Sequence, residues 1–364
     1  MGACHQFVPA LEPGAVGQHT LEIQRTLRGA GIDSEVFAHI IDPSMADRGR
    51  AFTDYGSSFP GRRDDCLMYQ FAIGSIVAPF LRSRPERKAL NHHNITPPEM
   101  LAAWEPAMVP GLRWGTRQLL ELAASVDFAL ADSSFNRNDL WALGYRDIEV
   151  VPILLDFDGF DREGDLETQQ RLERDRAHGG ADLLFVGRIV PNKCQHDLIK
   201  ALVVYRRTFD PQARLRLVGG ATSDEYLRVL REYAAALGVA DAVDLTGPVS
   251  AGALGAYYRS ADVFVSASEH EGFCVPLLEA MHHGVPIVAF AAAAVPETLA
   301  GAGVLLDSKS PAMFAAAIHE VVSDPLTRGA MVDAGRLRLR DFDLETTRAR
   351  FLDVLATHGI TGTG

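Results

Sequence analysis

Residues 261–289 read ADVFVSASEHEGFCVPLLEAMHHGVPIVA, and this stretch predicts a strand, a polar loop, a helix and a second strand. Residues 262–267 are a short apolar run of the kind found in buried parallel strands. After the polar loop, Pro276 suits the first turn of a helix, and Gly284 suits its end. Residues 287–290 form the second strand. The stretch is therefore predicted to be one βαβ unit of a parallel sheet.

Two carboxylates follow the first strand of this unit. Glu271 lies in the loop and Glu279 about one turn inside the helix. Open parallel sheets bind ligands outside the carboxyl ends of their strands, so both side chains can face one crevice. An alternative without a ligand also accounts for them: Glu279 complements the helix dipole, and Glu271 is a solvated loop acid.

The sequence EGFCVPLLEAM at 271–281, followed by Gly-Val-Pro at 284–286, resembles the E-x7-E signature of the retaining glycosyltransferases of family 4. The resemblance implies an α/β fold of the GT-B type, in which two Rossmann-like parallel-sheet domains face each other across a cleft. It also implies an activity. A hexose-type sugar would pass from a nucleotide diphospho-sugar to an acceptor hydroxyl, with its anomeric configuration retained.

The length of the chain agrees with two domains. At 364 residues it exceeds the size at which one core usually stops growing. We predict an acceptor-binding domain at 1–152 and a nucleotide-sugar-binding domain at 153–340. The last residues, 341–364, contain an amphipathic helix that in this family often crosses back to the first domain.

Composition excludes several classes of protein. The net charge of -12 argues against a nucleic-acid-binding protein, which needs a basic face. No apolar run approaches the roughly 20 residues of a membrane span, and no secretory signal is apparent. The four cysteines have no ligand-like spacing, which favours a reducing cytoplasm. Basic clusters at 62–63 and 82–88 could contact a membrane surface peripherally, or an acidic acceptor, although such runs are more often solvated.

The first domain is expected to begin with a strand at 5–9, a glycine-containing loop and a helix. Glycines at 14 and 17 permit close approach of a ligand to a helix amino end. By resemblance, Gly17 lies beside the donor diphosphate and the acceptor. Further on, the sequence predicts a long loop at 42–63 and several regular elements. These are a buried helix at 67–81, a helix at 119–126, a strand at 128–131, a helix at 136–143 capped by 132–134, and a strand at 148–152.

His92 and His93 precede an Ile-Thr-Pro-Pro stop, so they are expected at a strand end. Either histidine could simply hydrogen-bond to the surrounding structure. The family commonly has a histidine near the transferred sugar and the acceptor, and its pattern matches His93 better than His92. An imidazole there could bind a sugar hydroxyl or position the reacting alcohol.

The second domain is expected to begin with a buried strand at 181–188 that ends in Gly187-Arg188. Pro191-Asn192-Lys193 follows, and then a helix at 196–205. A guanidinium and an ammonium on one strand-end loop suit a diphosphate. Two solvated surface cations are the alternative, and the family's matching Gly-Arg and Lys favour the diphosphate. Further elements are predicted at 214–218, 243–249, 254–260 and 342–358.

The resemblance assigns roles to these residues. Glu271, His93, Arg188 and Lys193 are the predicted catalytic residues, and Gly17, His92 and His93 the acceptor-binding ones. Predicted donor-binding residues are Gly17, Gly187, Arg188, Lys193, Val249, Glu271, Gly272, Phe273, Cys274, Val275 and Glu279. No Asp-x-Asp motif stands at a strand end, so metal independence is expected and no cofactor is predicted.

The family usually has glycines before the Pro-Glu pair at 296–297, where this chain has alanines at 291–294. Alanine enters positive φ less easily, so this wall of the donor site is expected to differ in shape. A UDP-linked hexose is favoured over GDP-mannose on family frequency alone. Alternatives are a non-catalytic nucleotide-sugar-binding protein or an epimerase of the same fold. A phosphorylase-like enzyme would be larger, and a dehydrogenase would need a G-x-G-x-x-G array that is lacking.

Overall fold

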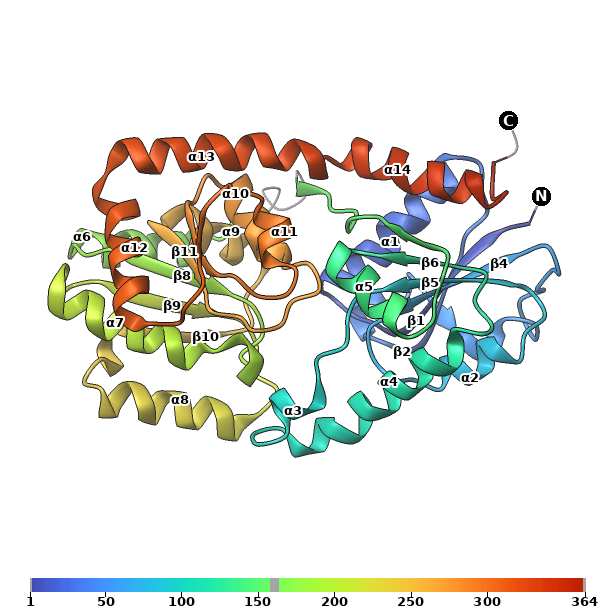
Figure 1. Ribbon diagram of the computed structural model, residues 1–364, viewed down its shortest axis with the longest axis horizontal. Helices are drawn as coiled ribbons and strands as arrows, with labels where there is room; N and C mark the ends of the chain where they lie inside the picture. Colours follow the sequence, from blue (N-terminus) through green and yellow to red (C-terminus); the bar gives the residue numbers. More distant parts are fainter. Residues whose placement is uncertain (1, 158–163, 363–364) are drawn as a thin grey trace. The chain divides into compact units, whose positions relative to one another are not determined.

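The computed structural model describes residues 2–157 and 164–362. The chain folds into two compact units (Figure 1). Unit 1 comprises residues 1–98, 107–155 and 341–364, and unit 2 comprises 99–106 and 156–340. None of the helices in the described residues is long and apolar enough to cross a membrane.

The sheet of unit 1 has seven parallel strands in the order β3-β2-β1-β4-β5-β6-β7. The order reverses direction between β1 and β4, as in doubly wound sheets. The strands are β1 (Cys4–Leu11), β2 (Val36–Ile41), β3 (Arg50–Ala51), β4 (Cys66–Phe71), β5 (Arg87–His92), β6 (Phe128–Ala131) and β7 (Ile148–Val150).

Helices cover both faces of this sheet. The helices of unit 1 are α1 (Ala15–Gly29), α2 (Val77–Arg82), α4 (Val109–Leu122), α5 (Ser134–Ala142) and α14 (Leu344–Thr357). One apolar cluster joins α1 and α14 to the sheet through Ile23, Leu27, Phe351 and Leu355, all fully buried. A second cluster joins α2, α4 and α5 to the opposite face. The carboxyl-terminal helix α14 therefore belongs to the core of unit 1.

The sheet of unit 2 repeats the arrangement with six parallel strands in the order β10-β9-β8-β11-β12-β13. The strand order of this sheet reverses between β8 and β11. The strands are β8 (Asp182–Val186), β9 (Arg214–Val218), β10 (Val243–Gly247), β11 (Val263–Ser266), β12 (Ile287–Phe290) and β13 (Val304–Leu306). The fold is thus of the α/β class, with two parallel, Rossmann-like sheets.

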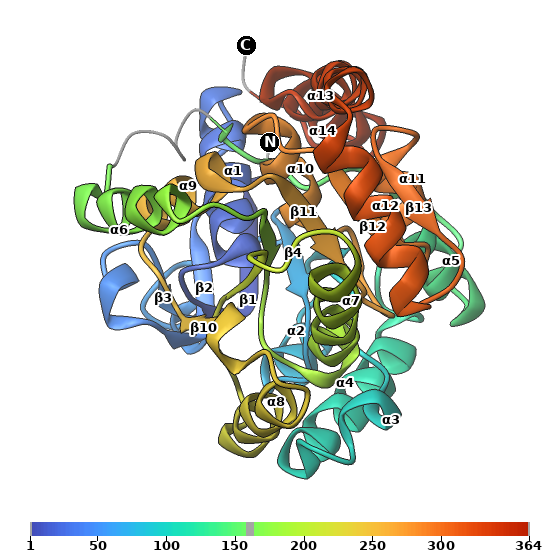
Figure 2. The ribbon, with the colours of Figure 1, turned by 90° about the vertical axis from the view of Figure 1, so that its left-hand side faces the viewer.

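Helices flank the second sheet as well (Figures 1 and 2). On one face, α7 and α12 lie side by side and share one apolar cluster with α8 and the sheet. On the other, α9 packs against α6. The helices of unit 2 are α6 (Leu166–Ala177), α7 (Gln195–Thr208), α8 (Asp224–Ala236), α9 (Ala251–Ser260), α10 (Val275–His282), α11 (Val295–Leu299), α12 (Pro311–Ser323) and α13 (Pro325–Leu339).

Short elements complete the chain. Helix α3 (Pro98–Leu101) begins the segment 99–106, which belongs to unit 2 because Trp104 packs on Tyr226 and Glu105 accepts a 2.5 Å hydrogen bond from Thr222. The single-turn 3-10 helices include Pro43–Met45, Phe52–Asp54, Pro106–Met108, Pro191–Lys193, Ala240–Ala242 and Arg340–Phe342. The sequence did not indicate that 99–106 leaves the first unit, and the division falls after Leu155 instead of Pro152.

Two predicted helices were wrong in extent or type. Residues 67–81, expected as one helix, form the central strand β4 followed by α2. The apolar run that suggested a helix is a strand buried on both faces, and such runs lack a diagnostic period. The helix expected at 119–126 is α4, which begins at Val109 and ends at Leu122. Its first half contains Pro110, Gly111 and Gly115, whose low helix propensity hid the helical pattern.

Candidate functional site

Two loops of unit 2 meet at the point where its strand order reverses. β8 and β11 are neighbours in the sheet, and the loops that follow them are 187–194 and 267–274. Gly187 follows β8 with a φ of 150°, and its carbonyl lies so close to Gly219 that a Cβ there would approach it to 2.1 Å. Ligands of open α/β sheets bind at such reversal points. These two loops contain the predicted donor residues Gly187, Arg188, Lys193 and 271–274.

The first loop supplies two cations. Arg188 is exposed and forms no ion pair with the residues the structure describes. Lys193 is largely buried, and its Nζ lies 2.5 Å from Oε1 of Glu271 on the second loop. The structure thus brings together two of the predicted catalytic side chains. An anion bound at this loop would contact the Arg188 guanidinium directly. It would compete with the Glu271 carboxylate for the Lys193 ammonium.

Backbone contacts fix the two loops against each other. The Asn192 carbonyl accepts a hydrogen bond from the N–H of Glu269 at 2.9 Å, and its side-chain amide donates to the carbonyl of His270 at 3.3 Å. Asn192 is buried. The spacing of Lys193 and Glu271 is therefore set by the backbone, and does not depend on their own ion pair.

Non-glycine residues hold left-handed backbone at three positions around this site. Cys194 (φ 54°) and Cys274 (φ 71°) are the N-caps of α7 and α10, and Ala293 (φ 52°) follows β12. Left-handed backbone costs an L-residue about 1–2 kcal/mol relative to a regular conformation. Within the alanine stretch at 291–294, Ala293 therefore adopts the backbone that glycine would favour, at an energetic cost.

Glu279 is buried inside α10, and Tyr258 of α9 donates a hydrogen bond to its Oε2 at 2.6 Å. Burial raises the pKa of Glu279 to about 6, while the Tyr258 hydrogen bond opposes the shift. A carboxylate with this pKa changes charge close to neutral pH. One of its two oxygens is engaged by Tyr258, so a ligand hydroxyl would bind the other.

The remaining predicted donor residues lie around these loops. Phe273 is buried, and its carbonyl accepts a 2.6 Å hydrogen bond from Thr298 of α11. Gly272 and Val275 are half-buried on either side of Phe273 and Cys274. Val249 is half-buried too, just before the N-cap of α9. The structure brings these residues into unit 2, with their contacts to a ligand still to be tested.

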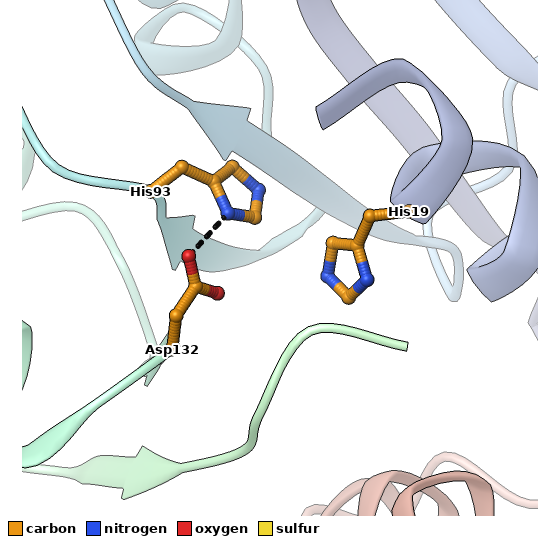
Figure 3. Close-up of side chains that lie close together, drawn as sticks. All are labelled: His19, His93 and Asp132. Carbon is orange, nitrogen blue, oxygen red and sulfur yellow. Dashed lines mark hydrogen bonds and ion pairs between the residues drawn. The ribbon is translucent and has the colours of Figure 1, made fainter. Parts of the chain in front are cut away.

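The predicted histidine site lies in unit 1 (Figure 3). His93 follows the end of β5, and its side chain is only 2% exposed. Its Nδ1 lies 2.9 Å from Oδ2 of Asp132, and its Nε2 lies 2.7 Å from the Gln70 side-chain amide. Both ring nitrogens therefore have protein partners. Asp132, expected only within a helix cap, instead pairs with His93, and Ser133 caps α5.

His92 and Gly17 have structural roles that are visible in unit 1. His92 is the last residue of β5 and is buried, with its carbonyl bonded to Asn136. Gly17 lies in the first turn of α1, where a Cβ would approach the Glu12 carbonyl to 2.0 Å. The need for glycine at position 17 is therefore explained by the fold itself, whether or not a ligand also binds there.

Two groups of side chains have the spacing of a metal site. They are His19, His93 and Asp132 in unit 1, and Cys194, His196 and Asp197 in unit 2. In the first, His93 bonds to Asp132 and Gln70, and His19 accepts a hydrogen bond from the N–H of Leu154. In the second, Lys309 approaches both Cys194 and Asp197. Protein groups thus compete for the atoms that a metal would need.

The basic clusters considered for an acidic surface are largely neutralised. Arg62 pairs with Asp64, Arg82 with Glu121 and Arg84 with Glu86. The Lys88 ammonium is buried and donates to backbone carbonyls. These contacts favour the interpretation of 82–88 as ordinary structural surface.

Four functional candidates were missed in the sequence: Tyr258, Asn192, His19 and Asp132. Asn192 was part of the quoted Pro-Asn-Lys loop, and His19 stands two residues after Gly17, so proximity to predicted residues was a signal for both. Tyr258 and Asp132 contact their partners across 21 and 39 residues of sequence. No local pattern indicates pairs at that separation.

Comparisons with known proteins agree with this architecture. Residues 167–338 match the family model of glycosyl transferases group 1. The D-inositol 3-phosphate glycosyltransferase of Geodermatophilus obscurus is 36% identical over 231 residues, 61% of this chain and 51% of that protein. The GDP-mannose-dependent alpha-(1-6)-phosphatidylinositol monomannoside mannosyltransferase of Mycolicibacterium smegmatis is 32% identical over 219 residues. These are 57% of this chain and 56% of that protein. The chain thus aligns with about half the length of these curated relatives.

Among solved structures, HepE (Alr3699) of Anabaena, determined in complex with UDP and glucose, superposes with a TM-score of 0.75. The superposition covers 98% of this chain and 100% of that one, at 16% sequence identity. At that identity the likeness establishes the fold alone. The two parallel-sheet units are therefore those of the GT-B architecture, as the sequence predicted.

Proposed function

Residues 167–338 of this chain belong to the group 1 glycosyltransferases, and on that premise we propose that the protein transfers a hexose-type sugar from a nucleotide diphospho-sugar to an acceptor hydroxyl. The anomeric configuration is retained in this proposal. The observation that carries it is the Lys193–Glu271 ion pair between the two loops at the strand-order reversal of unit 2, with Arg188 on the first loop and Glu279 on the helix that follows the second. These are the charges that a nucleotide diphospho-sugar requires.

Each part of the donor has a matching group. The diphosphate binds the exposed guanidinium of Arg188 and the ammonium of Lys193, one a planar multiple donor and the other a point charge. Hydroxyls of the sugar bind Glu271 and the N–H groups of the loop at 272–274. The ribose diol binds Glu279, as acids do in other Rossmann-type sites.

Leaving-group stabilisation is the main catalytic contribution in this account. Negative charge grows on the diphosphate as the bond to the sugar breaks, and preorganised donors at such positions contribute about 10² to 10³-fold each. Lys193 is paired with Glu271 before the donor binds. On binding, Lys193 turns to the diphosphate and frees Glu271 for the sugar, so one ion pair is exchanged for two ligand contacts.

The acceptor is proposed to bind unit 1 at Gly17, His92 and His93. His93 is oriented by Asp132 at 2.9 Å, and an acceptor hydroxyl would bind its Nε2 in place of Gln70. The cations of unit 2 make a metal unnecessary for the diphosphate in this proposal. All four cysteines are free and buried, which fits the proposed reducing, cytoplasmic location.

We favour uridine as the base, with the hexose bound beyond the diphosphate. A UDP complex of the similarly folded HepE supports this choice, whereas the GDP-mannose-dependent relative makes guanosine the alternative. Val249 and the backbone beside it, at the start of α9, are the proposed base-binding surface. The test must therefore include both classes of donor.

The experiment incubates the purified protein with UDP-glucose, UDP-N-acetylglucosamine and GDP-mannose and measures release of UDP or GDP. Wild-type protein is expected to bind one donor and to hydrolyse it slowly without an acceptor. Arg188→Ala should reduce the release about 10² to 10³-fold. Arg231→Ala, which removes an exposed arginine of α8, is the matched control and should leave the rate unchanged.

The possible outcomes are distinguishable. Binding of a donor without release of nucleotide, even in the presence of candidate acceptors, would favour a nucleotide-sugar sensor. Interconversion of the sugar without transfer would favour an epimerase. Failure of every donor to bind would contradict the proposed site as a whole.

A further inference from the structure

A row of buried polar side chains connects His19 to His93 in unit 1. They lie on α1, on the three neighbouring strands β1, β4 and β5 and directly after β5, and they are Gln6, His19, Gln70, Asn91 and His93. The Asn91 amide is 3.1 Å from Nε2 of His19 and 3.0 Å from the Gln70 amide, and Gln70 is 2.7 Å from Nε2 of His93. Figure 3 shows the two imidazoles and Asp132 at the end of the row.

The direction of hydrogen bonding along this row is decided at His19. Its Nδ1 accepts a hydrogen bond from the N–H of Leu154 at 2.9 Å. A neutral imidazole that accepts at Nδ1 carries its hydrogen on Nε2. His19 is 1% exposed, and burial lowers its pKa well below the ordinary value, so the ring is neutral. Its Nε2–H must therefore donate to Asn91.

The remaining bonds follow in sequence. The oxygen and nitrogen of a side-chain amide are told apart by their partners. If Asn91 presents its oxygen to His19, the same oxygen faces Gln70, and Gln70 must present its NH2 group. That group then donates to Nε2 of His93 at 2.7 Å. The Gln70 oxygen accepts from the Gln6 amide at 2.5 Å, which exchanges the amide oxygen and nitrogen of both side chains relative to the structure, where Gln70 is the donor to Gln6. His93 carries its hydrogen on Nδ1 and donates to Asp132 at 2.9 Å.

The opposite direction of hydrogen bonding is incompatible with the two contacts of His19. With the Asn91 NH2 group facing His19, both nitrogens of one neutral ring would face donors, and one of the two bonds would be lost. An unsatisfied buried donor costs about 1–3 kcal/mol. Among the described residues of the row, one NH2 group and one amide oxygen, at Gln6 and Asn91, lack a partner in either direction, so the amides themselves do not decide. Only the direction set by His19 gives every contact in the row one donor and one acceptor.

We propose that His19 is a positioning residue that, through Asn91 and Gln70, holds His93 as the neutral tautomer with its hydrogen on Nδ1 and a lone pair on Nε2. A hydroxyl that replaces Gln70 at Nε2 can donate a hydrogen bond or a proton to this tautomer, whereas an imidazolium could accept neither. Among the described residues, Asp132 and His19 are the titratable side chains in contact with His93. The catalytic consequence rests on the proposed function, but the tautomer itself does not.

The test is long-range ¹H–¹⁵N NMR of the full chain labelled with ¹⁵N-histidine, with signals assigned from His19→Gln and His93→Gln variants. At pH 7 we expect a neutral Nδ1–H tautomer for His93 and a neutral Nε2–H tautomer for His19. A doubly protonated His93, or hydrogen on Nδ1 of His19, would overturn the proposal. The wild-type spectrum decides this even if a variant fails to fold.

The His19→Gln variant tests the coupling. Glutamine can present either end of its amide, so the row loses its fixed direction. The long-range spectrum of His93 should then show a mixture of its Nδ1–H and Nε2–H tautomers. An unchanged Nδ1–H tautomer of His93 in folded His19→Gln would refute the coupling, whether or not the protein proves to be a transferase.

His5→Gln is the matched control. His5 is also a buried histidine of unit 1 whose Nδ1 accepts a backbone hydrogen bond, from Glu35 at 3.1 Å, and it takes no part in the row. Its replacement should leave the tautomer of His93 unchanged. If both variants shift His93 equally, the effect comes from general loosening of the domain, and the role of His19 is contradicted.

Discussion

Replacing Tyr258 by phenylalanine tests how the hydrogen bond from Tyr258 affects the pKa of Glu279. The change removes one hydroxyl, which donates to Glu279 Oε2 at 2.6 Å, and keeps the ring that stacks on His283. That bond favours the carboxylate, so its loss raises the pKa of Glu279 further. Hydrogen bonds to charged groups contribute about 1.5–3 kcal/mol, and about 1.4 kcal/mol corresponds to one pKa unit. The pKa of Glu279 should therefore rise from about 6 by about one to two units.

The assay is calorimetric titration with the preferred nucleotide sugar between pH 5 and 8. Ribose hydroxyls donate to a carboxylate, so the affinity of wild-type protein should increase as pH rises through about 6 and Glu279 ionises. In Tyr258→Phe the increase should move to higher pH by about one to two units. A nucleotide sugar is used because its diphosphate has no terminal phosphate, whose own titration falls near pH 6.

Tyr257→Phe is the matched control. Tyr257 precedes Tyr258 on α9, but its hydroxyl bonds to Arg171 and has no contact with Glu279. The control should keep the wild-type pH profile. An unshifted profile in folded Tyr258→Phe, or a wild-type affinity that does not depend on pH between 5 and 8, would refute the proposed contact of Glu279 with the ribose.

Ala293→Gly should raise the free energy of unfolding by about 0.5–1 kcal/mol, since relief of left-handed strain exceeds the entropy cost of glycine. Denaturant titration measures the change. The control is Ala316→Gly in the middle of α12, which should lower the free energy of unfolding by about 1 kcal/mol. If both variants were less stable than the wild-type protein, Ala293 would not be strained. Glu271→Gln should release Lys193 from its ion pair, so that nucleotide diphosphate binds at least as tightly as to the wild-type protein while sugar transfer falls. A parallel loss of binding and transfer would contradict the proposed exchange of the ion pair for ligand contacts. Phe351→Ala should lower stability by about 3–5 kcal/mol, because this fully buried ring joins α14 to unit 1, and a loss below 1 kcal/mol would show that α14 is not part of that core.

The acidity of Glu279 also has a consequence for stability. Its folded pKa of about 6 lies above its ordinary value of 4.5, so ionisation opposes folding. The difference of about 1.5 units corresponds to about 2 kcal/mol, retained below pH 4.5 and lost as the pH rises through 6. The proposed contact of Glu279 with the ribose would account for a buried carboxylate at this position.

Much of unit 2 could be predicted because the residues that begin and end each helix and strand lie next to it in the sequence. The strand, loop and helix at 262–284 each have their own turn and cap residues, and β12 begins and ends where the apolar run does. The donor-side residues follow from strand ends of a parallel sheet, whose carboxyl termini must share one edge. That rule brings the loops of Lys193 and Glu271 to the same edge, but the ion pair between the two side chains was not predicted.

Other features depend on contacts between distant residues. The run at 67–81 is apolar throughout, and only its pairing with β1 and β5 makes its first part a strand. The His93–Asp132 pair forms because β5 and β6 are neighbours, which no spacing in the sequence reveals. The segment 99–106 joins unit 2 through Trp104 and Glu105, two side chains without a recognisable motif.

The central claim is that the loops after β8 and β11 hold a nucleotide diphospho-sugar. A crystal structure with the donor selected by the panel tests it most directly. The account predicts the diphosphate within hydrogen-bond distance of Arg188 and Lys193, and the ribose on Glu279. A nucleotide bound away from these loops, with the Lys193–Glu271 pair intact, would contradict it.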